Sequence, residues 1–536
     1  MLTLKNLAIS FESNDDTIHA VNNTSLTIEP GQFVGLVGES GSGKSVTALS
    51  ILDLLPTNAT IGGDILWKGT QLNTADRTHL QHTRGKDIGM IFQNPMLAFN
   101  PVLTIGNHFI ETIQLHQSVT KHEAELLAID YLDKVHITQP KKRLSQYPHE
   151  FSLGMCQRAM IALTLSMQPS LLIADEPTAS LDVTVQAEIM KLLDEINHDM
   201  NMAILFISHD LGVIAQHCDY VYIMYLGDIL EQGQTAEIFK QPSHDYTKTL
   251  LSSIPNPDPT TRKTPFKTHT TSKTKPLLTL TDLSVQFNVK TDPFTAVSGS
   301  SLSINAGDFV GLAGESGSGK SVTALSILDL LPSTATIGGD IFWNGQSITG
   351  LNHHELQRIR GNQIGMIFQN PLMAFNPVLT IGAHFIETLQ LHQQLTNHAA
   401  EKKALEFLNK VHITHPEKRL HQYPHEFSLG MCQRAMIALT LCMEPALLIA
   451  DEPTASLDVT VQAQIMDLLT EINQELNTAI LFISHDLGVI AQHCDYVYIM
   501  YLSNIVEHGD TVRIFTDPQH SYTKRLLSAI PKPIPR

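Results

Sequence analysis

Two glycine-rich segments have the residue types and the spacing that bind a polyphosphate. Both fit the pattern G-x-x-x-x-G-K-[ST], and the first lies directly after the strand-like FVGLV and before the helix-like SVTALSILDLL. Glycines let backbone N–H groups surround phosphate oxygens at a helix start, while the lysine and the serine hydroxyl serve the β/γ-phosphates and magnesium. The candidate phosphate-binding residues are Gly38, Ser40, Gly41, Ser42, Gly43, Lys44, Ser45, Gly314, Ser316, Gly317, Ser318, Gly319, Lys320 and Ser321.

Two acidic pairs follow apolar segments and supply candidate catalytic and metal-binding groups. The sequence LLIADE occurs twice and places two carboxylates at the end of an apolar strand, where a metal or a water must solvate them. Asp175 and Asp451 suit the coordination shell of Mg²⁺. Glu176 and Glu452 suit polarising the water that attacks a phosphoryl group.

A histidine follows a second apolar segment in each half of the chain. His209 and His485 both come directly after AILFIS. A lone histidine is usually structural, but the strand-end position and the repetition favour a functional role. We expect a neutral imidazole at each position that senses the γ-phosphate.

The elements that must position these groups predict an α/β fold. Each half opens with an alternating apolar segment, LTLKNLAISF or LLTLTDLSVQF, and passes through a strand into the glycine loop and a helix. LLIAD and AILFIS are typical of buried parallel strands. The long stretch between Gln93 and Asp175 has helical character, which includes HEAELLAIDYLDKV, and predicts an α-helical subdomain inserted into the core.

The chain contains one domain written twice. GQFVGLVGESGSGKSVTALSILDLLP from Gly31 reappears as GDFVGLAGESGSGKSVTALSILDLLP from Gly307, and the same shift relates the acidic pairs and the histidines. We expect a first domain over residues 1–255, a flexible linker over 256–276 and a second domain over 277–536. A linker rich in Thr, Pro and Lys has a reach of about 25 Å, which lets the two domains pair within one chain.

Composition excludes several classes of function. A formal charge of −18 opposes a large surface for polyanions, so nucleic acid is not an expected partner. The five cysteines have no paired C-x-x-C spacing, which argues against a disulfide framework, a zinc site or an iron–sulfur site. No apolar run approaches the ~20 residues that span a bilayer, and we expect that the chain does not itself cross a membrane.

The remaining markers resemble those of the ATP-binding-cassette (ABC) family, and the resemblance spans nearly the whole chain. Gln93 and Gln369 resemble the Q-loop, which in the family links magnesium and the attacking water to a transmembrane partner. FSLGMCQ occurs twice and resembles the signature, and SLD from Ser180 and Ser456 resembles the D-loop. The implied fold is α/β, with two P-loop NTPase domains of the ABC type, each a mixed-sheet core with an inserted α-helical subdomain.

The resemblance implies a head-to-tail sandwich of the two halves. Neither half alone surrounds the γ-phosphate, so ATP binding would close the interface and hydrolysis would release it. The first implied site combines Lys44, Ser45, Gln93, Asp175, Glu176 and His209 with Ser428 and Gly430. The second combines Lys320, Ser321, Gln369, Asp451, Glu452 and His485 with Ser152 and Gly154. The implied cofactors are ATP and Mg²⁺, and the implied metal ligands are Ser45, Gln93, Asp175, Ser321, Gln369 and Asp451.

The signature departs from the family pattern at two positions. Leu153 and Leu429 replace the first of two adjacent glycines, and leucine tolerates a positive φ poorly. We expect a negative φ in the first turn of a helix, where the change has little effect, and comparable hydrolysis at both sites. Cysteine replaces the usual Arg at positions 156 and 432, which is expected to remove a cation near the nucleotide.

The residue that stacks on adenine is less distinct. The first half offers Ile18 and His19, and the second half offers Phe294, which we expect to be the stacking residue.

Three further motifs resemble the oligopeptide, dipeptide and nickel importer branch of the family. These are YPHEFS before each signature, DVTVQA after each D-loop, and the tails HDYTKTLLSSIP and HSYTKRLLSAIP. The resemblance implies peptide uptake, with two transmembrane permease subunits as direct partners and a solute-binding protein as an indirect one. It also implies a peripheral position on the cytoplasmic face of a bacterial inner membrane.

Other functions fit the sequence less well. Nickel or another small solute remains an alternative cargo, because selection lies in separate subunits. A ribosome-binding translation factor would have a longer, charged inter-domain segment and basic surfaces, and a DNA-repair cassette would have zinc-ligand cysteines. An exporter is a nearer rival that the tails disfavour.

Overall fold

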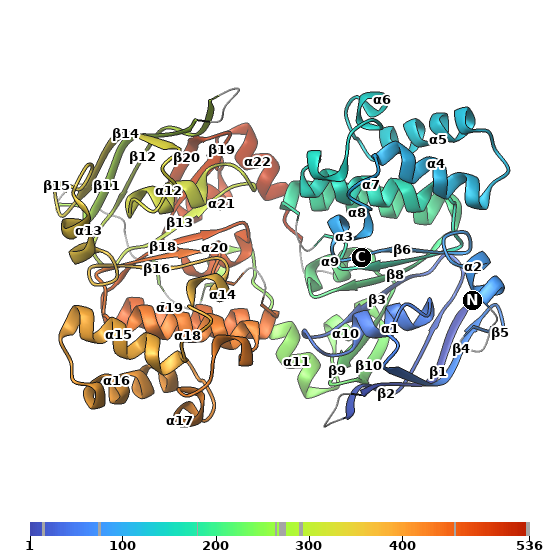
Figure 1. The fold of residues 1–536 in the computed structure, drawn as a ribbon, viewed down its shortest axis with the longest axis horizontal. Coiled ribbons are helices and arrows are strands. Elements are labelled where there is room, and N and C mark those ends of the chain that lie inside the picture. Colours follow the sequence, from blue (N-terminus) through green and yellow to red (C-terminus); the bar gives the residue numbers. More distant parts are fainter. Residues whose placement is uncertain are drawn as a thin grey trace. The chain divides into compact units, whose positions relative to one another are not determined.

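The structure is a computed structural model, and it describes residues 1–12, 17–72, 77–178, 181–262, 265–266, 275–288, 293–454 and 457–531. The chain forms two compact units (Figure 1). The first comprises Met1–Ile254 with the chain end from Pro531, and the second comprises Pro255–Ile530. Each unit has two sheets and a group of helices.

The first unit contains ten strands and eleven α-helices among its described residues. Its strands are β1 (Leu2–Glu12), β2 (Thr17–Ile28), β3 (Phe33–Val37), β4 (Ala59–Trp67), β5 (Thr70–Gln71), β6 (Ile88–Ile91), β7 (Leu171–Asp175), β8 (Ala203–Ser208), β9 (Tyr220–Tyr225) and β10 (Asp228–Gln234). Its helices are α1 (Lys44–Ile51), α2 (Arg77–Thr83), α3 (Pro95–Ala98), α4 (Ile105–His116), α5 (Lys121–Lys134), α6 (Pro140–Arg143), α7 (Leu153–Leu165), α8 (Val183–Met200), α9 (Leu211–His217), α10 (Thr235–Lys240) and α11 (Asp245–Ser252).

The second unit repeats this order element by element. Its strands are β11 (Leu278–Phe287), β12 (Phe294–Ile304), β13 (Phe309–Ala313), β14 (Ala335–Trp343), β15 (Gln346–Ser347), β16 (Ile364–Ile367), β17 (Leu447–Asp451), β18 (Ala479–Ser484), β19 (Tyr496–Tyr501) and β20 (Asn504–Asp510). Its helices are α12 (Lys320–Ile327), α13 (His353–Ile359), α14 (Pro371–Ala374), α15 (Ile381–Gln393), α16 (Asn397–Lys410), α17 (Pro416–Arg419), α18 (Leu429–Leu441), α19 (Val459–Glu475), α20 (Leu487–His493), α21 (Thr511–Thr516) and α22 (Ser521–Ser528).

A six-stranded sheet forms the centre of each unit. In the first unit its order is β10-β9-β3-β8-β7-β6, with every pair parallel except β9 and β10. The second unit has the same order from β20 to β16. A second sheet, antiparallel and four-stranded, has the order β2-β1-β4-β5 or β12-β11-β14-β15. The predicted strands LLIAD and AILFIS are confirmed as neighbouring parallel strands.

The central strands are apolar on both faces because each face packs against a separate core. In β3, Phe33 and Val37 belong to a core shared with the helices, while Val34 and Leu36 belong to a core shared with the antiparallel sheet. This double burial explains why the strand is a continuous apolar run rather than an alternating one.

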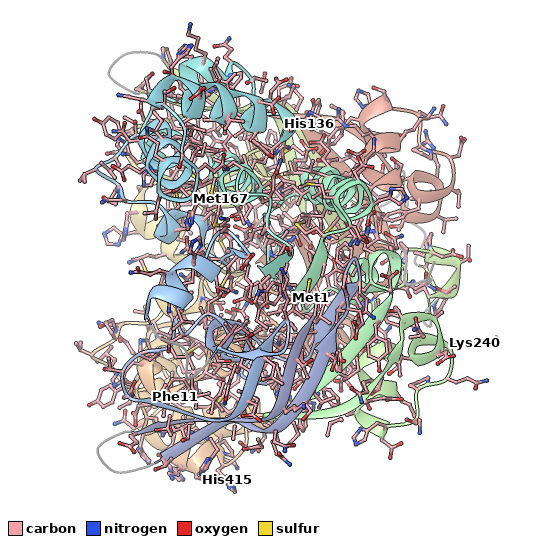
Figure 2. All side chains as sticks on the ribbon, turned by 90° about the vertical axis from the view of Figure 1, so that its right-hand side faces the viewer. Met1, Phe11, His136, Met167, Lys240 and His415 are labelled. Atoms are coloured by element: carbon pink, nitrogen blue, oxygen red, sulfur yellow. The ribbon has the colours of Figure 1, made fainter. Side chains whose placement is uncertain are left out.

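The predicted helical subdomain is confirmed in both units. In the first unit α4, α5 and α7 lie on one side of the central sheet and β1, β2 and β4 on the other (Figure 1). Figure 2 shows the same division, with Phe11 on the strand side and His136 on the helical side. Helix α5 begins at a capping box, in which Thr120 and Glu123 satisfy each other's backbone N–H groups.

The segment expected to be a flexible linker begins with residues that pack on the second unit. Gln492, on α20, donates to the backbone carbonyl oxygens of Asn256 and Asp258 at 2.7 and 2.9 Å. Arg262 forms a 3.0 Å ion pair with Asp495, and both side chains are almost fully buried. Residues 256–262 therefore differ from the expected tether, because specific polar contacts hold them. Residues 263–264 and 267–274 lie outside the described part of the chain.

We predict that Arg262→Ala destabilises the second unit by about 3 kcal/mol, because it leaves the Asp495 carboxylate buried without its partner. Urea unfolding gives the loss, and hydrogen exchange of β18 assigns it to the second unit. The double variant Arg262→Met with Asp495→Asn removes both charges and should recover much of the stability. An unchanged unfolding free energy for Arg262→Ala would contradict the prediction.

Candidate nucleotide site

The glycine loop lies between β3 and α1, as the motif requires. Lys44 is buried and folds back over the loop, where its Nζ donates to the carbonyl oxygens of Gly38 and Glu39, both at 2.7 Å. Lys320 makes the same contacts in the second unit, at 2.8 Å each. The lysine therefore holds the loop closed, and a phosphate group could replace the two carbonyl oxygens as its partner.

Two glycines of the loop are required by its backbone path. Gly43 caps α1 with a φ of 100°, a conformation that side chains other than glycine rarely adopt. At Gly38 a Cβ would come within 2.0 Å of the carbonyl oxygen of Met224 on β9. The second unit repeats both features at Gly319 and Gly314. The loop thus packs tightly against its own sheet.

Ser45 and Asp175 meet at the start of α1 and the end of β7. Ser45 Oγ donates to Asp175 Oδ1 at 3.0 Å, and Ser321 donates to Asp451 at 2.9 Å. Burial raises the pKa of Asp175 to about 6, and the hydrogen bond from Ser45 opposes this rise. A hydroxyl and a carboxylate at one point are the oxygen ligands that Mg²⁺ accepts beside phosphate.

The second carboxylate of each pair has an unusual backbone. Glu176 and Glu452 both have a φ of 46°, in the left-handed region. The N–H of Glu176 donates to the carbonyl oxygen of Ile207 on β8 at 2.9 Å, which fixes the turn. This strained residue at a strand end is typical of an active site.

His209 and Gln93 both contact the Glu176 carboxylate. His209 Nδ1 lies 3.3 Å from one oxygen, and Gln93 Nε2 donates to the other at 2.9 Å. Burial raises the pKa of Glu176, but the hydrogen bond and charge of His209, together with Lys44 and Gln93, bring it below its ordinary value.

The histidine has the opposite balance. Burial lowers the pKa of His209, but the Glu176 carboxylate outweighs burial and leaves it above the ordinary value. The Glu176 carboxylate therefore shifts His209 towards its protonated form, and the neutral imidazole that senses the γ-phosphate stays a prediction. His485 and Glu452 repeat the 3.3 Å contact, and Gln369 donates to Glu452 at 2.7 Å.

A pocket of about 220 Å³ lies beside the second glycine loop. Its wall includes Phe287 and Phe294, which pair across β11 and β12, and it reaches Lys320 and Glu452. Phe294 is more than half exposed, so its ring is accessible to a planar base. This placement supports Phe294 as the stacking residue. Phe287 is an additional aromatic wall that the sequence reasoning missed.

The signature residues lie elsewhere in their own unit. Ser152 caps α7, where its Oγ accepts from the N–H of Met155 at 3.3 Å, and Ser428 caps α18 in the same way. Neither Ser428 nor Gly430 lines the pocket of the second unit. Within one unit the loop, the acidic pair, the glutamine and the histidine thus lie together. The signature of the same unit is not part of this group. Ser180 and Ser456 of the D-loop lie outside the described residues.

The two departures in the signature have clear structural consequences. Leu153 is the first residue of α7 and does not have a positive φ, so the expected conformation in the first turn of a helix is confirmed, and the same holds for Leu429. The Cys156 side chain is fully buried, with Sγ 3.4 Å from the carbonyl oxygen of Pro148. The loss of a cation near the nucleotide at this position stays a prediction.

Comparison with known proteins places the chain in a family. A family profile described as "ABC transporter" matches residues 21–179 and 297–455, which is more than half of the chain. The chain belongs to the ABC transporter family. It is an ATPase with two ATP-binding cassettes, and it binds and hydrolyses ATP as a subunit of a transporter. A second profile, "Oligopeptide/dipeptide transporter, C-terminal region", matches residues 230–278 and 506–536.

Relatives of this ABC protein match it over nearly its full length. The "Uncharacterized ABC transporter ATP-binding protein YejF" of Escherichia coli (strain K12) is 41% identical over 98% of this chain and 99% of the relative. The "Glutathione import ATP-binding protein GsiA" of Shigella dysenteriae serotype 1 is 38% identical over 99% of this chain and 89% of the relative. A solved ATP-binding cassette bound to ADP and Pi has a TM-score of 0.41 and 26% identity, and it covers 44% of this chain.

Within the described parts of the chain, none of the helices combines the length and the apolar character that crossing a membrane demands.

We predict that replacing both buried aspartates, Asp175→Asn with Asp451→Asn, stabilises the nucleotide-free protein at pH 8. Each aspartate has a pKa of about 6 in the folded protein, which is above its value in the unfolded chain. The folded state therefore loses stability as the pH rises through about 6 and the carboxyl ionises. The amides remove this cost, roughly 3 kcal/mol per site. Thermal unfolding at pH 8 and pH 5 should show a gain at pH 8 that shrinks towards pH 5.

We expect Mg²⁺ with ATP to stabilise the wild-type protein, and the same variant should lose this stabilisation because the amide is a weaker ligand than the carboxylate. A gain of equal size at both pH values would contradict the assignment of this titration to the two aspartates.

We predict that the aromatic residue makes the second nucleotide site tighter than the first. Phe294→Ile should weaken ATP binding roughly three- to tenfold at that site, because a base loses its stacking surface. Ile18 occupies the same register position opposite Phe11, so Ile18→Phe should tighten the first site. Calorimetric titration checks both. Binding of inorganic triphosphate, which has no base, is the control, and an equal loss there would contradict stacking.

Proposed function

We propose that this ABC protein energises the uptake of oligopeptides or dipeptides through a membrane importer. The observation that carries the proposal is the tail region, residues 230–278 and 506–536, which matches the C-terminal region of oligopeptide and dipeptide transporters after each cassette. A relative of the same architecture is named for glutathione import, and glutathione-sized peptides are therefore suitable first substrates for a test.

The ATP sites in this proposal are shared between the cassettes. Lys44, Ser45, Gln93, Asp175 and Glu176 already meet around one loop, while the signature serine of the same unit caps a helix in its helical subdomain. A second copy of the signature is available only from the other cassette, at Ser428 and Gly430. Pairing within one chain would complete both sites, which is the head-to-tail arrangement that the sequence implies.

The residues of each site divide the chemistry of hydrolysis. Ser45 and Asp175 would hold Mg²⁺, which neutralises phosphate charge when bound. Glu176 would polarise the attacking water, and its contacts with His209 and Gln93 hold the carboxylate for this role. Its lowered pKa keeps it ionised and able to accept a proton from that water.

A permease has a suitable surface on the helical subdomain. A groove of about 600 Å³ runs beside α15 and is lined by Leu379, Ala383, Ile386, Glu387, Gln390 and Leu391. Met373 and Val378, between the Q-loop and this groove, are at least three-quarters exposed. Exposed apolar residues that gather beside a groove are typical of a binding surface for another protein. We propose a helix of a permease subunit as the occupant.

The first cassette offers the same kind of surface. Val102 lies in the segment before α4 and Leu115 lies in the last turn of α4, and both are about three-quarters exposed. Two such surfaces match two permease subunits. We propose that these partners hold the protein at the cytoplasmic face of an inner membrane.

We predict that Glu176→Gln and Glu452→Gln each lower ATP turnover by at least about 100-fold at their own site, because a general base is lost while ATP still binds. The functional test uses proteoliposomes that contain a pair of peptide-importer permeases, a solute-binding protein and labelled di- and tripeptides. Wild-type protein should drive ATP-dependent peptide uptake, and both variants should abolish it.

Glu195→Gln is the matched control, because Glu195 is an exposed glutamate on α8 and should leave uptake unchanged. Full turnover in either single Glu→Gln variant would contradict the assigned roles. Turnover that responds to ribosomes but not to the permeases would favour a translation factor instead of an importer.

A further inference from the structure

A tyrosine from the tail helix contacts the second residue of each phosphate-binding loop. The Tyr246 hydroxyl, on α11, accepts a hydrogen bond from the backbone N–H of Glu39 at 3.3 Å. The Tyr522 hydroxyl, on α22, accepts from the N–H of Glu315 at 3.0 Å. Both pairs are 207 residues apart in sequence, so each unit builds the contact independently.

The tyrosine ring is fixed against the sheet that carries the loop. Tyr246 packs on Tyr225, the last residue of β9, with ring centres 4.4 Å apart. Tyr522 stacks on Tyr501, the last residue of β19, at 4.0 Å and an interplanar angle of 20°. Because β9 pairs with β3, the ring is anchored on the strand next to the loop.

A buried glutamate holds the turn that leads into each tail helix. Glu231, on β10, accepts hydrogen bonds from the N–H and hydroxyl of Ser243 and from the N–H of His244, at 2.6 to 3.1 Å. Burial raises the pKa of Glu231, but these hydrogen bonds outweigh it and lower the pKa to about 2. Glu507 accepts from two backbone N–H groups at the corresponding turn of the second unit. The tail helix is therefore fixed where it begins.

The contact restrains the loop at a peptide that the lysine also holds. The carbonyl oxygen of Glu39 accepts from Lys44 Nζ at 2.7 Å, while the N–H of the same residue donates to Tyr246. When a nucleotide draws the lysine towards its phosphates, the tyrosine remains as a restraint on this residue. The following N–H groups of the loop are the ones that surround a phosphate.

We infer that Tyr246 and Tyr522 are positioning residues for the two nucleotide sites: each tail helix holds the phosphate-binding loop in its binding conformation through one backbone hydrogen bond. This inference rests on the proposal that the two loops hold the nucleotide phosphates. It gives the tail a role inside the ATPase, in addition to its use as a marker of peptide transporters.

The second unit holds its loop more firmly than the first. The Arg525 guanidinium lies over both rings, 5.9 Å from the centre of Tyr501 and 5.6 Å from that of Tyr522, and 3.9 Å from the Glu315 carboxylate. Thr249 occupies the corresponding place in the first unit. Tyr522 is buried, whereas Tyr246 is half-buried. The loss of the hydroxyl should therefore matter more at Tyr522.

The test removes only the hydroxyl, with Tyr522→Phe and Tyr246→Phe in the full chain. Tyr522→Phe should raise the Kd for ATP at one of the two sites, and with it the KM for ATP, roughly three- to tenfold. The kcat should stay within about twofold of the wild-type value. Tyr246→Phe should have a smaller effect in the same direction. Arg525→Thr, which keeps the tyrosine, should raise the Kd about twofold.

Tyr498→Phe is the matched control for lost stability. The Tyr498 hydroxyl also accepts from a backbone N–H, that of Ser303 at 3.0 Å, but this contact lies away from the loop. Its removal should lower the Tm about as much as Tyr522→Phe does and leave the KM unchanged. If Tyr522→Phe lowers the Tm but leaves both KM and Kd at the wild-type values, the tyrosine is only structural and the inference is wrong.

A separate variant distinguishes failure of this inference from failure of the proposed sites. Lys44→Ala with Lys320→Ala should abolish ATP binding if the loops hold the phosphates. Wild-type ATP affinity in that variant would overturn both the proposed sites and the inference that rests on them. Lost affinity there, together with an unchanged Kd in Tyr522→Phe, would overturn the inference alone.

Discussion

The buried aspartate at the end of β7 is the constraint on which the nucleotide site depends. Asp175 is almost fully buried, so its charge needs the Ser45 hydroxyl in the nucleotide-free protein and a cation when phosphate is bound. That need fixes the start of α1 against the end of β7, and with it the whole glycine loop. The site is therefore built at a cost in stability that its ligands offset.

The parallel sheet brings the residues of the site to the buried aspartate. Strands β3, β7 and β8 are neighbours and run in the same direction, so the loop, the acidic pair and the histidine all emerge at one edge. The same adjacency lets the N–H of Glu176 reach the carbonyl oxygen of Ile207 and hold a left-handed backbone. Strand order thus converts three distant motifs into one site, and the helical subdomain is free to carry the signature.

Much of this could be predicted from the sequence, because the informative residues are local. The loop, the two apolar strands and the helical insertion each occupy one continuous segment with its own periodicity, and the duplication repeats every motif. The features that escaped prediction depend on contacts between distant segments. The Tyr246 contact spans 207 residues, the Arg262 ion pair spans 233, and the protonation of His209 depends on a carboxylate from another strand. Nothing in the local pattern around these residues specifies such partners.

The two cassettes differ in the residues around the chemistry and not in the chemistry itself. Loop, acidic pair, glutamine and histidine superpose in type and in contact distance, which argues for hydrolysis at both sites. Two of the differences are Ile18 against Phe294 at the predicted base position and Thr249 against Arg525 beside the loop, and on the predictions above both would favour tighter binding in the second cassette. A difference in ATP affinity between the cassettes would then come from these neighbouring residues, since the catalytic groups are the same.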